Sequence, residues 1–153
     1  MFLCNAPVRI VCVGNRMVAG DDLGPRVHDH LAANALPDGL AVIDGGLQGL
    51  NLLGILDGAQ RVVFVDALAG VRPGRAQRVA RRRVLANGGA HFDHGAGLGY
   101  LVRAMQVGCD EPPRAWSLVG AAGAASPDVI GAVANLALLE AARPVRAAAA
   151  ARA

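Results

Sequence analysis

Residues 61–65 (RVVFV) constrain the fold most strongly, because the four apolar side chains after Arg61 follow one another without the alternation of a half-exposed strand. An apolar run of this length is typical of a parallel strand covered on both faces. We therefore expect a central strand here. Asp66 follows the run directly, so it should stand at the carboxyl end of this strand, where open α/β sheets gather the groups of a site.

Shorter apolar runs alternate with helical periods along the rest of the chain. Strands are expected at residues 8–13, 40–43 and 115–119, an edge or antiparallel strand at 76–84, and helices from 21 to before Pro37, at 50–56 and 95–107, and after Ser126-Pro127-Asp128. This alternation predicts one three-layer α/β/α domain, residues 1–144, with a mostly parallel twisted sheet of about five strands. The Ala/Arg tail, residues 145–153, has no apolar period and is expected to fray.

The composition excludes several classes of function. The net charge of +3 comes from arginine, and the one basic run, residues 81–83, reads as a solvated strand edge rather than a binding patch. With 3% aromatic residues, little could stack on bases, so we expect no nucleic-acid partner. The three cysteines form no zinc or redox motif. The sequence shows neither a secretory signal nor a membrane-spanning run, and we expect a cytoplasmic protein.

The glycine-rich turn after the first strand favours a cation over a phosphate. It lacks the inner glycine of a dinucleotide fingerprint and the lysine of a P-loop, and we expect no nucleotide cofactor. Asp21 and Asp22 follow it, where a helix begins and where a phosphate would otherwise bind. In the alternative interpretation, Asp21 caps the helix and Asp22 is an ordinary first-turn acid.

Asp66 and one histidine extend this acidic pair into a candidate metal site. His91 and His94 precede a predicted helix, and a helix N-terminus disfavours the imidazolium form, which leaves either ring neutral and able to bind a metal. Each residue also has a simpler explanation: Asp66 could cap a loop through backbone hydrogen bonds, and His94 could be an exposed loop residue. No serine or cysteine stands in a nucleophile motif, so a serine or cysteine protease is disfavoured.

Several short motifs, in order, resemble those of the hydrogenase maturation endopeptidases. The resemblance covers about residues 8–140 and rests on the motifs Gly14-Asn15 with Asp21-Asp22 and Gly24, Asp44-Gly45-Gly46 with Gly49 and Leu52-Leu53, Val65-Asp66-Ala67, Pro73-Gly74, His94 with Gly97-Leu98, and Ser126-Pro127. It implies a peptidase that removes the C-terminal peptide from a nickel-loaded [NiFe]-hydrogenase large-subunit precursor in the cytoplasm. That precursor is the implied partner.

The same resemblance implies the site residues. The nickel-binding and catalytic positions of the family fall on Asp22, Asp66 and His94, with nickel supplied by the precursor, and Asn15, Gly45 and Gly46 could contact the substrate backbone. The metal could serve as a recognition mark or as a Lewis acid. Two alternatives stay open: a nickel-site checkpoint or chaperone that does not cleave, and a small metal-dependent hydrolase with another substrate.

Overall fold

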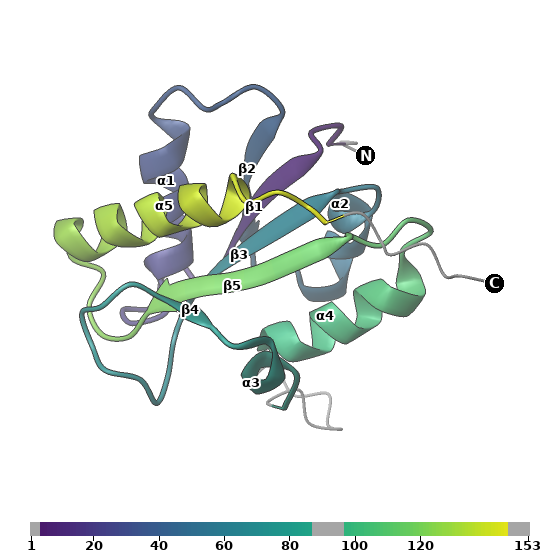
Figure 1. Ribbon diagram of the computed structural model, residues 1–153. Coiled ribbons are helices and arrows are strands. Elements are labelled where there is room, and N and C mark those ends of the chain that lie inside the picture. The colour runs from purple at the N-terminus through teal and green to yellow at the C-terminus, as the bar shows by residue number, and fades with distance from the viewer. Residues whose placement is uncertain (1–3, 87–96, 147–153) are drawn as a thin grey trace.

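The computed structural model describes residues 4–86 and 97–146, which form a sheet between two layers of helices (Figure 1). The strands are β1 (Val8–Val13), β2 (Leu40–Gly46), β3 (Arg61–Ala67), β4 (Gln77–Val79) and β5 (Ala115–Ala121); the helices are α1 (Leu23–Ala32), η1 (Gly49–Leu52, a 3-10 helix), α2 (Leu53–Leu56), α3 (Arg81–Ala86), α4 (Gly97–Gly108) and α5 (Pro127–Ala141). The strand order is β2-β1-β3-β5-β4, and β4 alone of these five is antiparallel to its neighbour. The predicted fold class is confirmed.

Strand β3 lies at the centre of the sheet, as its apolar run predicts. Side chains alternate between two cores: Val63 and Val65 pack against the α1 and α5 layer, and Val62 and Phe64 against the layer of α2, α3 and α4. All four are fully buried. By the usual measure, burying each such side chain contributes about 1.5 to 3 kcal/mol, so β3 anchors both layers.

Helix α5 begins as its sequence predicts. The Ser126 hydroxyl accepts a hydrogen bond from the Val129 N–H at 3.3 Å, and Pro127 occupies the first turn. The cap satisfies an amide that would otherwise lack a partner, and proline there gives up no helical hydrogen bond.

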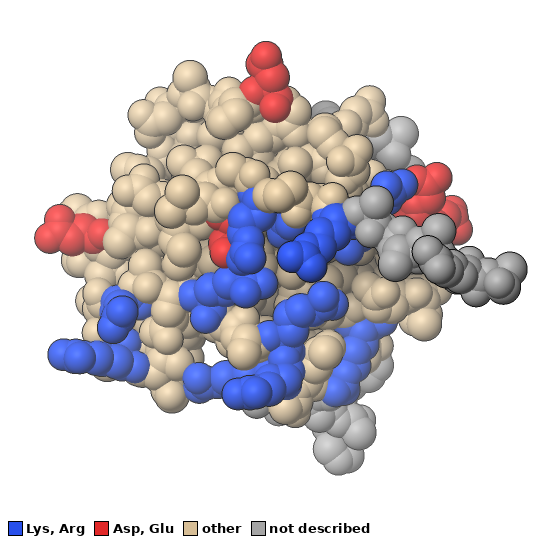
Figure 2. Space-filling view, in the orientation of Figure 1, with Lys and Arg blue, Asp and Glu red and all other residues tan. Residues whose placement is uncertain are grey.

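The strand predicted at residues 76–84 is wrong beyond Val79. Strand β4 pairs with β5 over three residues, and α3 then begins at Arg81, so the arginine run lies on a helix. The alternation stops after Val79, and arginine is a good helix former. The helix buries Val84 against the sheet and places Arg81 over the Trp116 ring, 4.6 Å from its centroid. Figure 2 shows arginines gathered over the part of this face where β4 and α3 lie in Figure 1.

Two further expectations can be compared only in part. Helix α4 begins at Gly97, and residues 95 and 96, where its start was predicted, lie outside the described residues. The same holds for the tail after residue 146. No helix in residues 4–86 or 97–146 combines the length and apolarity needed to cross a membrane.

Gly120 should be indispensable to the packing of β3 against β5. A Cβ added there would lie 1.9 Å from the carbonyl oxygen of Asp66, whereas one added at Gly131 in α5 would meet nothing within 4 Å. We expect Gly120→Ala to lower the free energy of unfolding by about 2 kcal/mol or more through overpacking. Gly131→Ala should raise it by up to about 1 kcal/mol through helix propensity. Chemical denaturation measures both; equal stability of Gly120→Ala and wild type would contradict the close approach.

Candidate active site

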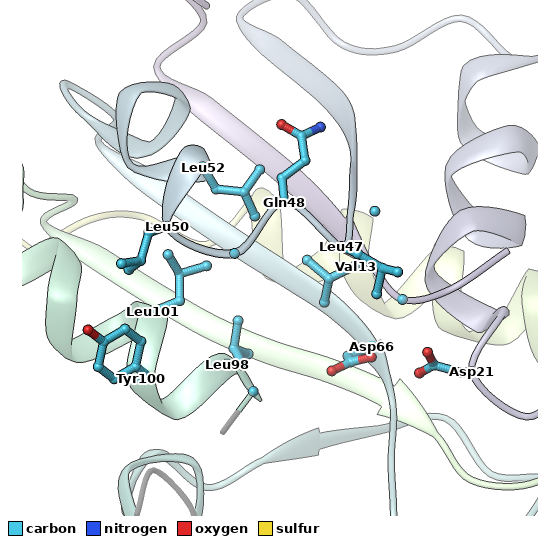
Figure 3. Close-up of a pocket in the computed structure, with 14 residues that line it drawn as sticks. Val13, Asp21, Leu47, Gln48, Leu50, Leu52, Asp66, Leu98, Tyr100 and Leu101 are labelled. Carbon is cyan, nitrogen blue, oxygen red and sulfur yellow. The ribbon is translucent and has the colours of Figure 1, made fainter. Parts of the chain in front are cut away.

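A pocket of about 500 Å³ opens at the carboxyl ends of the central strands. Its floor is formed by Val13 at the end of β1, Gly14 directly after it, Gly46 at the end of β2 and Asp66 near the end of β3. Successive strands depart to opposite sides of β1, and ligands bind at such a switch point in open α/β sheets. One wall is apolar and comes from η1 and α4, with Leu50, Leu52, Leu98, Tyr100 and Leu101 (Figure 3).

Asp66 stands where the sequence predicts, at the carboxyl end of the central strand. Its Oδ1 accepts a hydrogen bond from the Ala67 N–H at 2.8 Å. Burial raises the pKa of Asp66 to about 7, and the neighbouring Asp21 carboxylate contributes to the same shift. The Asp66 carboxyl can therefore take up or release a proton near neutral pH.

Asp21 is the second carboxylate of the pocket. Figure 3 shows its carboxylate beside that of Asp66, the two facing one another. The Asn15 N–H donates a hydrogen bond of 2.9 Å to Asp21 Oδ2. This fold-back requires Gly14, which has a φ of +136° and whose added Cβ would lie 2.3 Å from the Asp21 carbonyl oxygen. Only glycine adopts this conformation readily.

Asp22 does not join Asp66 in the pocket. It occupies the N-cap position of α1, and its Oδ2 accepts a hydrogen bond of 2.5 Å from Arg26 Nε, which holds the pKa of Asp22 below its usual value. The sequence contains the signal for this pair, because Arg26 lies four residues later on the same helix face. Helix α1 begins at Leu23, two residues later than expected, which leaves Asp21 in the preceding loop and free to face the pocket.

The remaining predicted site residues divide between the pocket and its support. Gly46 lines the pocket, Asn15 supports it through its backbone, and Gly45 is buried beneath it between the Val11 and Val13 side chains. His94 lies outside the described residues. Within the described part of the chain, no group of three or more histidine, cysteine, aspartate or glutamate residues is placed to hold a metal.

Arg16 ties the loop that carries Asp21 to its surroundings. Its guanidinium contacts Asp29 of α1 at 2.5 Å and Asp44 of β2 at 3.0 Å. Hydrogen bonds from Arg16 and His28 lower the pKa of Asp29 to about 2. These side chains are about half exposed, so the pairs orient the loop more than they stabilise the fold.

The arrangement suits a divalent cation. Two carboxylates face one another, and burial, with a smaller contribution from Asp21, raises the pKa of Asp66 and so disfavours its charged form. Carboxylates, with an imidazole where one is available, bind borderline divalent ions and leave positions for other ligands. The two carboxylates of Asp21 and Asp66 are thus oxygen donors of the kind that could hold a divalent ion.

Asp66 should make stability fall as pH rises. The ordinary pKa of an aspartate is 3.8, and the pKa of Asp66 in the folded protein is about 7. Between these two pH values the folded state therefore holds the proton more tightly than the unfolded state. The free energy of unfolding therefore decreases across this window and is lowest above it. We expect Asp66→Asn to raise it by about 2 kcal/mol at pH 8 and to change it little near pH 4. Urea denaturation at both pH values measures this; an equal gain at both would contradict it, and the exposed Asp110→Asn is the control.

Comparison with curated proteins identifies two relatives of part of the chain. The hydrogenase expression/formation protein HupD of Bradyrhizobium diazoefficiens is 35% identical over 74 residues, covering 47% of this chain and 38% of the relative. HupD of Rhodobacter capsulatus is 36% identical over 69 residues, covering 44% and 33%. The chain thus aligns with little more than a third of the length of these relatives.

Solved structures match most of the chain. The hydrogenase maturating endopeptidase HybD of Escherichia coli superposes with a TM-score of 0.67 at 25% identity, covering 86% of this chain and 87% of its own. The maturation protease HycI of Thermococcus kodakarensis KOD1 has a TM-score of 0.64 at 20% identity, covering 89% and 90%, and shows the same fold. The family model of the hydrogenase maturation proteases matches residues 25–134. That match spans more than two thirds of the chain, which therefore belongs to the hydrogenase maturation protease family.

Proposed function

We propose that this protein is an endopeptidase that removes the C-terminal peptide from a nickel-loaded [NiFe]-hydrogenase large-subunit precursor. The observation that carries the proposal is the pairing of Asp21 and Asp66 in a pocket at the switch point of the sheet. Family membership supports peptidase activity. The precursor as substrate, the nickel and the cytoplasm as the compartment remain predictions.

Nickel in this proposal arrives with the substrate. Asp66 and Asp21 would approach it from the floor of the pocket, with His94 as the third predicted ligand, while Asp22 supports α1 through Arg26. A bound divalent ion supplies Lewis-acid polarisation and orients the chain to be cleaved. The pKa of about 7 belongs to Asp66 in the metal-free protein, and its carboxyl would release its proton when it binds the ion.

The rim of the pocket favours a protein substrate over a small molecule. Met17 and Val18 lie on the loop after β1, and Leu47 and Leu50 lie on the segment after β2, next to or lining the pocket. Met17 is 89% exposed and Leu47 71% exposed. Large apolar side chains exposed beside a pocket are typical of surfaces that bind other proteins.

A cleavage assay tests the proposal. Purified protein is mixed with nickel-loaded and nickel-free large-subunit precursor from the same source, with Asp66→Asn and His94→Ala as variants. We expect a mass shift of the loaded precursor alone, and its loss in both variants. Binding of a loaded precursor without cleavage would contradict the peptidase and favour a checkpoint protein. Cleavage of unrelated peptides with any metal would favour a general hydrolase.

The two adjacent aspartates give a sharper comparison. Asp21→Asn should slow cleavage at least about tenfold, because it removes a carboxylate that faces Asp66. Asp22→Asn should stay within about threefold of wild type in cleavage rate while losing some stability, because its charge pairs with the half-exposed Arg26. Steady-state cleavage rates and melting temperatures separate the two effects. The reverse order of rates would place the metal-facing carboxylate on Asp22.

A further inference from the structure

A strongly basic stretch of chain adjoins the acidic pocket. Residues 67–109 contain seven arginines and one acidic residue, Asp93, whereas the rest of the chain has eight arginines and eleven acidic residues. Six of the seven come from the loop after β3, from β4 and from α3, and all six are exposed. We call them the arginine surface: Arg72, Arg75, Arg78, Arg81, Arg82 and Arg83. Figure 2 shows little red among the blue on this part of the face.

Half of the arginine surface has structural contacts. Arg78 pairs with Glu140 of α5 at 3.1 Å, Arg81 covers Trp116, and Arg83 Nη2 donates to the carbonyl oxygens of Ala69 and Gly70. These contacts hold β4, α3 and the loop after β3 in place. The other three arginines project from these same elements.

The other three arginines have no such structural contact. The guanidinium groups of Arg72, Arg75 and Arg82 make no ion pair or hydrogen bond within residues 4–86 and 97–146. Like charges gathered on one face repel one another (Figure 2), and Glu140, the acidic side chain that pairs with Arg78, is already shared with Arg143. A partner with several carboxylates would relieve this repulsion, and the planar guanidinium binds carboxylates in pairs of hydrogen bonds.

The arginine surface is continuous with the pocket. A second cavity of about 170 Å³ is lined by Arg83 together with Val79, Val84 and Leu118, and it shares Asp66, Gly97 and Leu98 with the larger pocket. An extended chain bound at Asp66 can therefore leave through this cavity toward Arg83. Its path leads from a negative region to a positive one.

From this geometry we propose that the arginine surface docks an acidic segment of the protein substrate, with several Asp or Glu side chains, while the adjoining chain occupies the Asp66 pocket. This inference rests on the proposed function. A single terminal carboxylate would engage one arginine and leave the others unpaired. Nucleic acid is disfavoured, because a phosphate backbone entering the pocket would meet the carboxylates of Asp21 and Asp66 and because the nearby indole, Trp116, is buried.

Charge reversal at the uncommitted arginines tests the inference. The variants are Arg72→Glu, Arg75→Glu and Arg82→Glu, and the control is Arg114→Glu, an exposed residue directly before the amino end of β5, whereas β4 pairs with the carboxyl-terminal half of that strand. Affinity for the purified large-subunit precursor from the same source is measured at about 50 and 300 mM salt, since screening weakens exposed pairs. We expect each variant to bind about three- to tenfold more weakly at low salt, with a smaller loss at high salt, and the control to stay within about twofold.

Cleavage kinetics and a nucleic-acid probe separate the remaining outcomes. With loaded precursor, the variants should raise KM and leave kcat unchanged. If the variants and the control lose affinity for the precursor equally, or none of them loses any, the inference is overturned. It is also overturned if the protein binds a single-stranded RNA oligonucleotide more tightly than the precursor and the same variants abolish that binding. Arginine-dependent binding without any cleavage would overturn the proposed function and leave the docking surface standing. Cleavage of the loaded precursor that is unchanged in the arginine variants would support the proposed function and overturn the docking surface.

Discussion

The burial of β3 on both faces is the constraint on which the rest of the structure depends. Because this strand packs against both helical layers, its register with β1 and β5 is fixed, and with it the position of Asp66 at the sheet edge. Gly120 permits β5 to approach the backbone of Asp66, and Gly14 permits the first loop to return toward it. The site is thus a product of strand geometry that two buried side chains on each face of β3 enforce.

The sequence was sufficient to predict what hydrophobic periodicity determines. The layers, the central strand, the capped α5 and the position of Asp66 all follow from patterns of burial and from local capping. Which of Asp21 and Asp22 faces the pocket could not be predicted in this way. It depends on whether α1 begins at residue 21 or residue 23, and helix ends respond to tertiary contacts. The Asp22–Arg26 spacing was the available signal. For the same reason alternation failed after Val79, where packing of Val84 and Trp116 favours a helix.

The charges of the molecule are separated rather than mixed. Carboxylates converge in the pocket, where burial makes a second negative charge costly, and arginines cover the neighbouring β4 and α3. Arg78 and Arg143 share the buried Glu140, which joins the edge of the sheet to the end of α5. A chain docked as proposed would meet opposite charges at its two ends, and such a gradient would fix its direction as well as its position.

The walls of the pocket come from connections beyond the strand ends, such as the loop that carries Asp21 and the segment that carries Leu47. The core residues that stabilise the fold lie within the strands and on the inner faces of the helices. Substitutions at the rim can therefore change specificity with little effect on folding, because the residues that bind substrate and the residues that stabilise the core occupy separate positions. A scaffold divided in this way can diversify toward new protein substrates while the carboxylate that ends β3 stays fixed.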